Sequence, residues 1–128
     1  MAPSAEGGPD LQAVTTLLQS YFTAINQHDY AAYASLLAPS MEQQNPASVF
    51  ASGYGSTTDT DATLTAISAT SSSGLAATVT FTSSQQPAES PDNSSCDEWA
   101  ITLYLVPGGT GYLIQAPPST YRATYSPC

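Results

Sequence analysis

The chain has 128 residues, 41% of them hydrophobic, which is a suitable size for a single domain around one core. Charged residues make up only 9% of the chain, and one basic residue stands against ten aspartates and glutamates, so the formal net charge is −9. Such a chain repels phosphate backbones and has no cations to replace their counterions, which excludes nucleic-acid binding.

The chain opens with MAPSAEGGPD, which has neither the basic segment nor the apolar stretch of a signal peptide. We interpret residues 1–9 as a flexible linker after an initiator methionine, and residues 10–128 as a single domain. We therefore expect the natural protein to continue upstream, with a signal, a lipid anchor or a membrane span there. Within the sequence, no apolar run is long enough to cross a membrane.

The most regular pattern in the chain is LQAVTTLLQSYFTAINQHD, residues 11–29. Its apolar side chains recur at helical spacing and form one continuous stripe, which predicts an amphipathic helix. The only histidine, His28, stands directly before Asp29 at the end of this stretch. We interpret residues 26–28 as a corner between two helices, with Asp29 capping the next one. Adjacent residues at such a corner rarely orient one another, so we do not expect an acid–base pair here.

Two shorter helices are predicted after this corner. The segment YAAYASLL (30–37) has apolar residues at helical spacing, and Pro39 is expected to close it. A third helix is expected to start with Asn45 as its cap and Pro46 at its first position, and to end at the glycines of GYG (53–55).

Beyond residue 55 the period of the sequence changes from helical to alternating, and β-branched and aromatic residues become frequent. The short glycine-bearing turns at 71–74 and 107–111 predict antiparallel hairpins, and QQPAESPDNSS (85–95) is interpreted as a mobile surface loop. Helices followed by a meander of strands predict an α+β domain, with the N-terminal helices packed on one face of a curved antiparallel β-sheet. The predicted strands are ATLTAISAT (62–70), LAATVTFTS (75–83), CDEWAITLYLV (96–106) and GYLIQA (111–116).

The two cysteines, Cys96 and Cys128, stand at the start of a predicted strand and at the last residue. A disulfide between them would fasten the C-terminal tail to the sheet and contribute about 3–4 kcal/mol in the loop-entropy model. The alternative is two unrelated free thiols. Because a bare cysteine at an exposed terminus is a liability, we favour the disulfide, and with it an extracellular or cell-envelope location.

Several of these patterns resemble one known family. The segment YFTAINQHDYAAYASLL (21–37), a short third helix, and strands carrying W-x-I-x-L-Y-L-V and then G-Y-L-I are similar to the NTF2-like superfamily, also called the SnoaL or ketosteroid-isomerase-like cone fold. More narrowly, the chain resembles small exported actinobacterial domains of this superfamily. These occur in secreted proteins, in lipoproteins and in the extracellular parts of membrane proteins, including receptor kinases. The resemblance implies a cone-shaped sheet covered by helices.

Enzyme activity of the ketosteroid-isomerase type needs a carboxylate base in an apolar cone and hydroxyl donors opposite it. Tyr21 and Tyr104 are candidate hydroxyls, and Asp59 or Asp61 in TTDTD is a candidate base. TTDTD reads as a polar turn before the first strand, however, which favours two solvated acids. The resemblance matches neither aspartate to a catalytic position, so no catalytic residue is assigned.

The residue types in the chain give little support for a metal or cofactor site. One histidine and a cysteine pair expected to be oxidised do not make a zinc site. The acidic pairs Asp59/Asp61 and Asp97/Glu98 lack the loop spacing of a calcium cage. We therefore predict no metal and no cofactor.

A ligand site is suggested by eight tyrosines and one tryptophan, some of which must line the concave side of a curved sheet. Because strand side chains alternate, Trp99 and Tyr104 are expected on opposite faces. The alternatives are that the rings are ordinary core and cross-strand partners, and that the lone arginine pairs with Asp97 or Glu98 rather than with a carboxylate ligand. The candidate ligand-binding residues are Tyr21, Tyr104, Tyr112 and Arg122.

The sequence thus favours a non-catalytic extracellular module that serves as a sensor, binding a small apolar ligand or a protein partner. We expect it to be tethered to a membrane or to a receptor kinase in the full-length protein. One alternative is a small cofactor-free enzyme of the isomerase or cyclase type that uses tyrosine and aspartate in the cone. Another is a structural spacer that forms a homodimer through its sheet.

Overall fold

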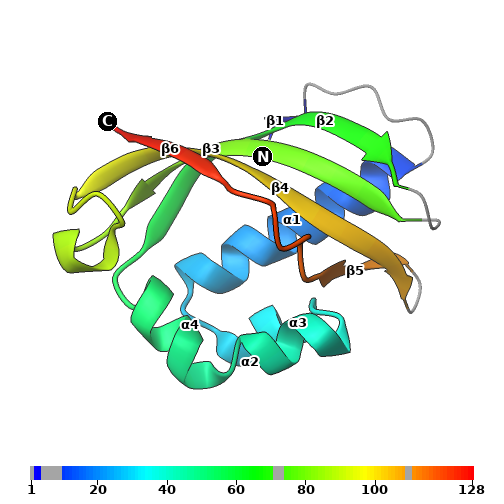
Figure 1. Ribbon diagram of the computed structural model, residues 1–128, viewed down its shortest axis with the longest axis horizontal. Helices are drawn as coiled ribbons and strands as arrows, with labels where there is room; N and C mark the ends of the chain where they lie inside the picture. Colours follow the sequence, from blue (N-terminus) through cyan, green and yellow to red (C-terminus); the bar gives the residue numbers. More distant parts are fainter. Residues whose placement is uncertain (1, 4–9, 71–73, 109–110) are drawn as a thin grey trace.

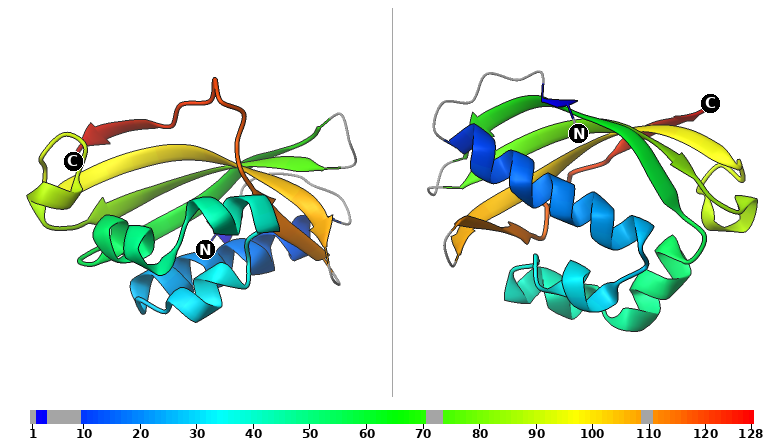
Figure 2. Two further views of the ribbon diagram at one scale, coloured as in Figure 1. Left: turned by 60° about the horizontal axis from the view of Figure 1, so that its bottom comes forward. Right: turned by 180° about the vertical axis from the view of Figure 1, so that it is seen from behind.

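The computed structural model describes residues 2–3, 10–70, 74–108 and 111–128. Its helices come first and lie on one side of a curved, mainly antiparallel sheet (Figure 1), an arrangement that the two further views in Figure 2 repeat. The predicted α+β class, with helices on one face of an antiparallel sheet, is therefore confirmed. The predicted linker at residues 1–9 lies outside the described residues except for Ala2–Pro3.

Helix α1 (Asp10–Asn26) is the longest helix and crosses the inner face of the sheet. Its apolar stripe is almost fully shielded from solvent, as its helical spacing predicts. This stripe forms one wall of the hydrophobic core. Its buried residues are Val14, Leu17, Leu18, Tyr21, Phe22, Ala24 and Ile25.

The corner after α1 is built as the sequence predicts. His28 takes a left-handed backbone conformation with φ 55°, and Asp29 caps the next helix by accepting a hydrogen bond from the backbone N–H of Ala32 at 3.2 Å. His28 is exposed. The histidine is therefore part of a helix–helix corner.

Helix α2 (Tyr30–Ala34) ends earlier than predicted, because the residues that follow it form hydrogen bonds with the sheet instead of continuing the helix. The following segment pairs with strand β5 (Gly111–Gln115). Ala38 N–H donates to the carbonyl of Ile114 at 2.7 Å, and Ile114 N–H donates to the carbonyl of Leu36 at 2.8 Å. These bonds draw residues 36–38 out of the helix and onto the sheet edge.

A further helix, α3 (Pro39–Gln44), was not predicted. Pro39 opens it instead of closing α2, because the fixed φ and missing N–H of proline suit the first turn of a helix. Asn45 is its C-cap, with Nδ2 donating to the carbonyl of Met41 at 2.8 Å, so Asn45 does not cap the next helix. Pro46 is the N-cap of α4 (Ala47–Tyr54), one residue later than expected.

The sheet has the strand order β1-β2-β3-β4-β5, with β6 paired to the other half of β4. Only the β1–β2 pair is parallel. Strands β1 and β6 were not predicted; β1 is two residues long, and β6 is an exposed edge strand that ends in proline. The strands are β1 (Ala2–Pro3), β2 (Thr58–Ala69), β3 (Leu75–Ser84), β4 (Cys96–Gly108), β5 (Gly111–Gln115) and β6 (Thr124–Pro127).

Strand β2 begins earlier than predicted and takes in all of TTDTD except Thr57, so this stretch is mostly strand and not turn. Its pairing with β3 shifts by one residue between Thr60 and Thr63, and Asp61 in this bulge has φ 57°. A bulge of one residue turns the preceding side chains to the opposite face of the sheet. Asp59 consequently points to the buried face, whereas Asp61 is exposed.

The inner faces of β3 and β4 are in register, with Ala77 opposite Leu103 and Val79 opposite Ile101. These side chains meet α1 to form the core. The turns predicted at 71–74 and 107–111 lie partly outside the described residues, but the strands that they join are antiparallel neighbours, as predicted.

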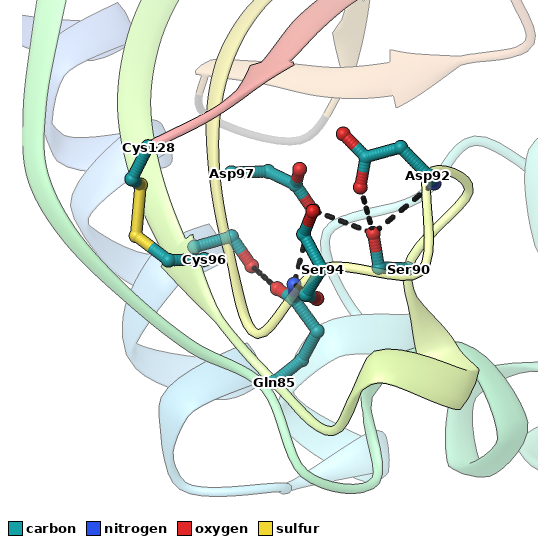
Figure 3. The surroundings of a disulfide bond; sticks show 8 residues. Gln85, Ser90, Asp92, Ser94, Cys96, Asp97 and Cys128 are labelled. Carbon is teal, nitrogen blue, oxygen red and sulfur yellow. Dashed lines mark hydrogen bonds between the residues drawn. A yellow bond between two sulfur atoms is a disulfide. The ribbon is translucent and has the colours of Figure 1, made fainter.

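The predicted disulfide is present, with 5.4 Å between the Cα atoms of Cys96 and Cys128. The N–H of Cys128 also donates to the carbonyl of Cys96 at 3.0 Å. Together with β6, the bond fastens the C-terminal segment to the first half of β4 (Figure 3). A structural disulfide is typical of proteins that fold in an oxidising compartment.

None of the described helices combines the length and the apolar character that a membrane span requires.

Candidate functional site

A cavity of about 160 Å³ lies between α1, the end of α4 and the inner face of strands β2 to β4. We call it the inner cavity. Its walls are mainly apolar, with a group of polar side chains at one end. The apolar and aromatic lining consists of Tyr21, Ile25, Tyr54, Phe81, Pro91, Trp99 and Ile101; the remaining lining residues are Thr57, Asp59, Ser83, Gln85, Ser90 and Asp97.

Three of the polar residues form a row across neighbouring strands. Asp59 on β2 is the ladder partner of Ser83 on β3, and Ser83 is the partner of Asp97 on β4. Residues directly opposite one another in a sheet share a face, so all three side chains project to the inner side. Asp59 is 7% exposed, Ser83 5% and Asp97 0%. The row therefore puts two buried carboxyl groups into the wall of one cavity.

The Asp59 carboxyl is desolvated. Burial raises its pKa from 3.8 to about 6, and a hydrogen bond from Ser83 opposes this rise without cancelling it. Oδ1 of Asp59 has no hydrogen-bond partner among the described residues. At neutral pH the cavity thus holds a carboxylate that the protein only partly compensates.

Asn26, at the end of α1, positions Asp59. Its Nδ2 donates to the backbone carbonyl of Asp59 at 2.9 Å, and the backbone N–H of Asp59 donates to Oδ1 of Asn26 at 2.6 Å. The amide side chain therefore pairs with β2 much as a neighbouring strand would. This clamp joins the helix corner to the strand segment that carries the carboxyl group.

The second carboxyl group, Asp97, is held by the 85–95 segment, which includes a short 3₁₀ helix at Pro87–Glu89. Gln85 Nε2 donates to Oδ2 of Asp97 at 3.0 Å, and Ser90 Oγ donates to the same oxygen at 2.7 Å (Figure 3). Ser90 also contacts Asp92. The segment predicted as a mobile surface loop is therefore tied to the cavity wall.

Asp97 is shielded from solvent by this thin loop although it lies near the protein surface. Burial raises its pKa, and hydrogen bonds from Ser90 and Gln85 oppose the rise. A hydrogen bond with the carboxyl group of Asp92, and the negative charge of Asp92, add to it. The pKa of Asp92 is lowered, chiefly by its hydrogen bond with Ser90. Oδ1 of Asp97, like that of Asp59, has no partner among the described residues.

Three tyrosines pack together at the helical side of the cavity. The ring centroids of Tyr21 and Tyr33 are 5.8 Å apart, and those of Tyr33 and Tyr54 are 5.9 Å apart. Burial raises the pKa of all three phenols, and the negative charge of Asp59 adds to the rise for Tyr21 and Tyr54. The phenols are therefore neutral at physiological pH, and the hydroxyls of Tyr21 and Tyr33 both hydrogen-bond to that of Tyr54.

The structure does not bring the four predicted ligand residues together. Tyr21 lines the inner cavity. Tyr104 lies on the outer face of β4, where its ring meets that of Tyr121 edge-on at 5.7 Å. Tyr112 packs against the core from β5 and does not line this cavity. The expected opposition of Trp99 and Tyr104 across the sheet is found.

Arg122 is exposed and lies outside the cavity. Its Nη1 donates to the backbone carbonyls of Ser119 at 3.0 Å and Tyr121 at 2.7 Å. The alternative pairing is not found either: among the described residues, no ion pair joins Arg122 to the buried Asp97 or to the exposed Glu98. The arginine therefore supplies no charge to the cavity.

Sequence reasoning passed over most of the cavity. Asp59 was weighed as a base but interpreted as solvated, and Ser83, Gln85 and Ser90 were not singled out. Gln85 and Ser90 belong to a polar segment whose contacts arise only from the folded chain. Within the described ranges, no group of three or more histidine, cysteine, aspartate or glutamate side chains is placed to hold a metal ion.

Comparisons with family models, with curated proteins and with solved structures give no match to this chain.

Proposed function

We propose that this chain is an exported domain that binds a small molecule in the inner cavity, with an NTF2-like cone as its fold. The observation that carries the proposal is the cavity itself, which combines apolar and aromatic walls with a few polar groups at one end. This combination is typical of small-molecule sites, where apolar walls supply affinity and a few polar groups set orientation.

The volume limits the ligand. A cavity of about 150 Å³ is known to accommodate benzene, so 160 Å³ fits a molecule of roughly six to ten non-hydrogen atoms. A steroid-sized ligand is too large for it.

A ligand is favoured over a protein partner because the surface offers little apolar area for docking. Among the described residues, only Val49 and Tyr125 are large hydrophobic side chains with substantial exposure. Protein interfaces are usually centred on larger contiguous patches. We expect a sensor or binding role for the domain.

An extracellular or cell-envelope location is proposed from the Cys96–Cys128 disulfide, which favours an oxidising compartment. The helices-then-sheet order is the layout that the NTF2-like resemblance implies. As in the exported domains that the chain resembles, we expect attachment to a membrane or to a receptor kinase in the full-length protein.

The test uses Trp99, the only tryptophan, which lines the cavity. Small aromatic and aliphatic molecules are titrated while Trp99 fluorescence and the unfolding temperature are followed. A ligand at about 100 times its Kd should add roughly 2.7 kcal/mol to the free energy of unfolding. Ile101→Phe should reduce binding by filling the cavity, whereas Ile67→Phe, on β2 but outside the cavity, should not. Equal binding by both variants would contradict the proposal.

A second candidate function is catalysis of the isomerase or cyclase type without a cofactor. The observation in its favour is Asp59, whose pKa of about 6 and position beside Tyr21 and Tyr54 suit proton abstraction near neutral pH. It is tested by incubating the protein with cyclohexanone in D₂O and following deuterium incorporation by NMR. Incorporation that is lost in Asp59→Asn would favour the enzyme; none is expected from a binding domain.

A further inference from the structure

We infer that the ligand of the inner cavity is a small organic cation, an alkyl or arylalkyl ammonium ion, whose charged group lies between the carboxylates of Asp59 and Asp97. This inference rests on the proposed binding function and specifies its ligand. It follows from the positions of the two carboxyl groups, from an accounting of the hydrogen-bond donors around them and from the aromatic walls.

The two carboxyl groups line the same cavity from different strands. Asp59 and Asp97 are separated by one strand, so their Cα atoms are two strand spacings, roughly 10 Å, apart. Both side chains project into the same cavity, with Ser83 between them. An ammonium group carries three donors and no acceptor, and it is the natural complement of two carboxylates.

The side-chain donors of Gln85, Ser83 and Ser90, next to the two carboxyl groups, are already used. The two N–H bonds of Gln85 Nε2 go to the carbonyl of Ser94 and to Oδ2 of Asp97. Ser83 Oγ donates its hydrogen to Oε1 of Gln85 at 2.7 Å, or else to Asp59. Each hydroxyl has one hydrogen to give, and an amide nitrogen has two.

The single hydrogen of Ser90 is likewise shared between Asp92 and Asp97. After this accounting, Oδ1 of Asp59 and Oδ1 of Asp97 are both buried and have no hydrogen-bond partner among the described residues; the same holds for Oδ2 of Asp92, which does not line the cavity. A buried acceptor without a donor is costly, and the cost is larger for a charged group. Oδ1 of Asp59 and Oδ1 of Asp97 therefore need hydrogen-bond donors from outside the chain.

No basic side chain meets this need. Arg122 is the only arginine in a chain without lysine, and it donates to backbone carbonyls away from the cavity. His28 is exposed at the helix corner. The formal net charge of −9 attracts cations and repels anions, so an anionic ligand is disfavoured.

The walls next to the carboxylates suit the body of an organic cation. Trp99 lies two residues from Asp97 on the inner face of β4 and stacks on Phe81 with an interplanar angle of 9°. Tryptophan is the aromatic side chain that attracts cations most strongly. An aromatic or aliphatic amine can place its apolar part against these rings. A hydrated metal ion has no apolar part and makes no such contact.

The experiment compares benzylamine with benzyl alcohol and benzoate, which share one ring but are cationic, neutral and anionic at pH 7. Binding is measured by calorimetry and Trp99 fluorescence at low ionic strength. Benzylamine should bind at least tenfold more tightly than benzyl alcohol, and benzoate should not bind. Asp59→Asn and Asp97→Asn should each weaken benzylamine binding at least about tenfold, as expected when one member of a buried charge pair is removed.

Matched controls are present on the same strands. Asp61→Asn removes the same charge two residues from Asp59, at an exposed position with φ 57° that asparagine tolerates. Glu98→Gln removes a charge next to Asp97 on the outer face of β4. Both variants should bind benzylamine with an affinity within about twofold of the wild-type value, because exposed charges are screened by solvent and salt.

The pH dependence provides an independent readout. The titratable groups facing the site are Asp59 and Asp97 on the sheet, Tyr21 from α1, Tyr54 from α4 and Asp92 from the 85–95 segment. The phenols do not titrate near neutrality. Because the pKa of Asp59 is about 6, lowering the pH from 7 to 5 protonates it and should weaken benzylamine by about tenfold. Binding at pH 6 should release protons.

The outcomes separate the two proposals. If benzyl alcohol binds as tightly as benzylamine, the cation inference is overturned while the binding cavity stands. Equal losses in Asp59→Asn and Asp61→Asn would also overturn it, since they indicate nonspecific attraction. If Ca²⁺ binds and displaces benzylamine at equal concentration, the site is a metal site instead. If none of the three aromatic probes binds at millimolar concentration, both proposals fail.

Discussion

At the scale of single residues, Asp59 dominates the properties of the inner cavity. An acid whose pKa is raised in the folded state binds its proton more tightly there than in the unfolded chain, so it favours folding at low pH. That contribution is fully present below about pH 3.8 and is lost as the pH rises to about 6. The free energy of unfolding should therefore carry an Asp59-dependent decrease across this window.

Asp59→Asn should remove this decrease. A shift of the pKa from 3.8 to about 6 corresponds to at most about 3 kcal/mol, so we expect the variant to be more stable than the wild type by about 1–3 kcal/mol at pH 7. The two proteins should converge toward pH 4. Urea unfolding at several pH values between 4 and 7 measures the difference, with Asp61→Asn as the control. A variant less stable than the wild type at every pH would contradict desolvation of Asp59.

The bulge at Asp61 explains why the sequence pointed away from Asp59. Counting back from the buried Leu64 in steps of two places Thr60 and Thr58 inside and Asp59 outside. The extra residue in β2 reverses this order. Alternation alone cannot locate a bulge, so the turn-like composition of TTDTD prevailed in the sequence-based interpretation.

At the scale of elements, the Asn26 clamp joins α1 to β2. Asn26→Ala should remove two hydrogen bonds to the backbone of Asp59 and leave its partly buried N–H and carbonyl without their partners. We expect a loss of about 1–3 kcal/mol in the free energy of unfolding and weaker ligand binding. Chemical denaturation and fluorescence titration measure the two effects. Gln27→Ala, at an exposed neighbouring position, is the control, and equal losses in both variants would exclude a specific clamp.

The disulfide and β6 form a second connection between elements. Replacing both cysteines by serine should lower the free energy of unfolding by about 3–4 kcal/mol, because the unfolded chain regains the entropy of an open loop. The Tyr125 ring, 4.8 Å from that of Trp99, should also become more mobile and change the Trp99 fluorescence of the folded protein. Unchanged stability and unchanged emission would show that β6 does not depend on the bond.

Elements with a long repeating pattern of apolar residues could be predicted from the sequence. Helix α1 has an unbroken apolar stripe, and β3 and β4 alternate over most of their lengths. Helix α3 was missed because it is short and exposed, and its proline reads equally well as an end or a beginning. The early end of α2 depends on hydrogen bonds to Ile114, more than seventy residues away in the sequence, which no local pattern reveals.

At the scale of the whole molecule, the layout of helices followed by an antiparallel sheet leaves the inner cavity between its two layers. The candidate site depends on strand register, which brings Asp59, Ser83 and Asp97 into one row from three separate segments. The tyrosines and the arginine singled out from composition lie mostly elsewhere. Sequence patterns therefore indicated the fold class, whereas locating the site required the folded structure.

The most direct test of the central claim is a pH titration of the Asp59 side-chain carboxyl carbon by ¹³C NMR in the ligand-free protein. A desolvated carboxyl group in the inner cavity should titrate with a midpoint of about 6. Adding benzylamine should lower that midpoint, because a bound cation favours the carboxylate. A ligand-free midpoint near 3.8, the ordinary value for aspartate, would mean that Asp59 is solvated and would contradict the proposed site.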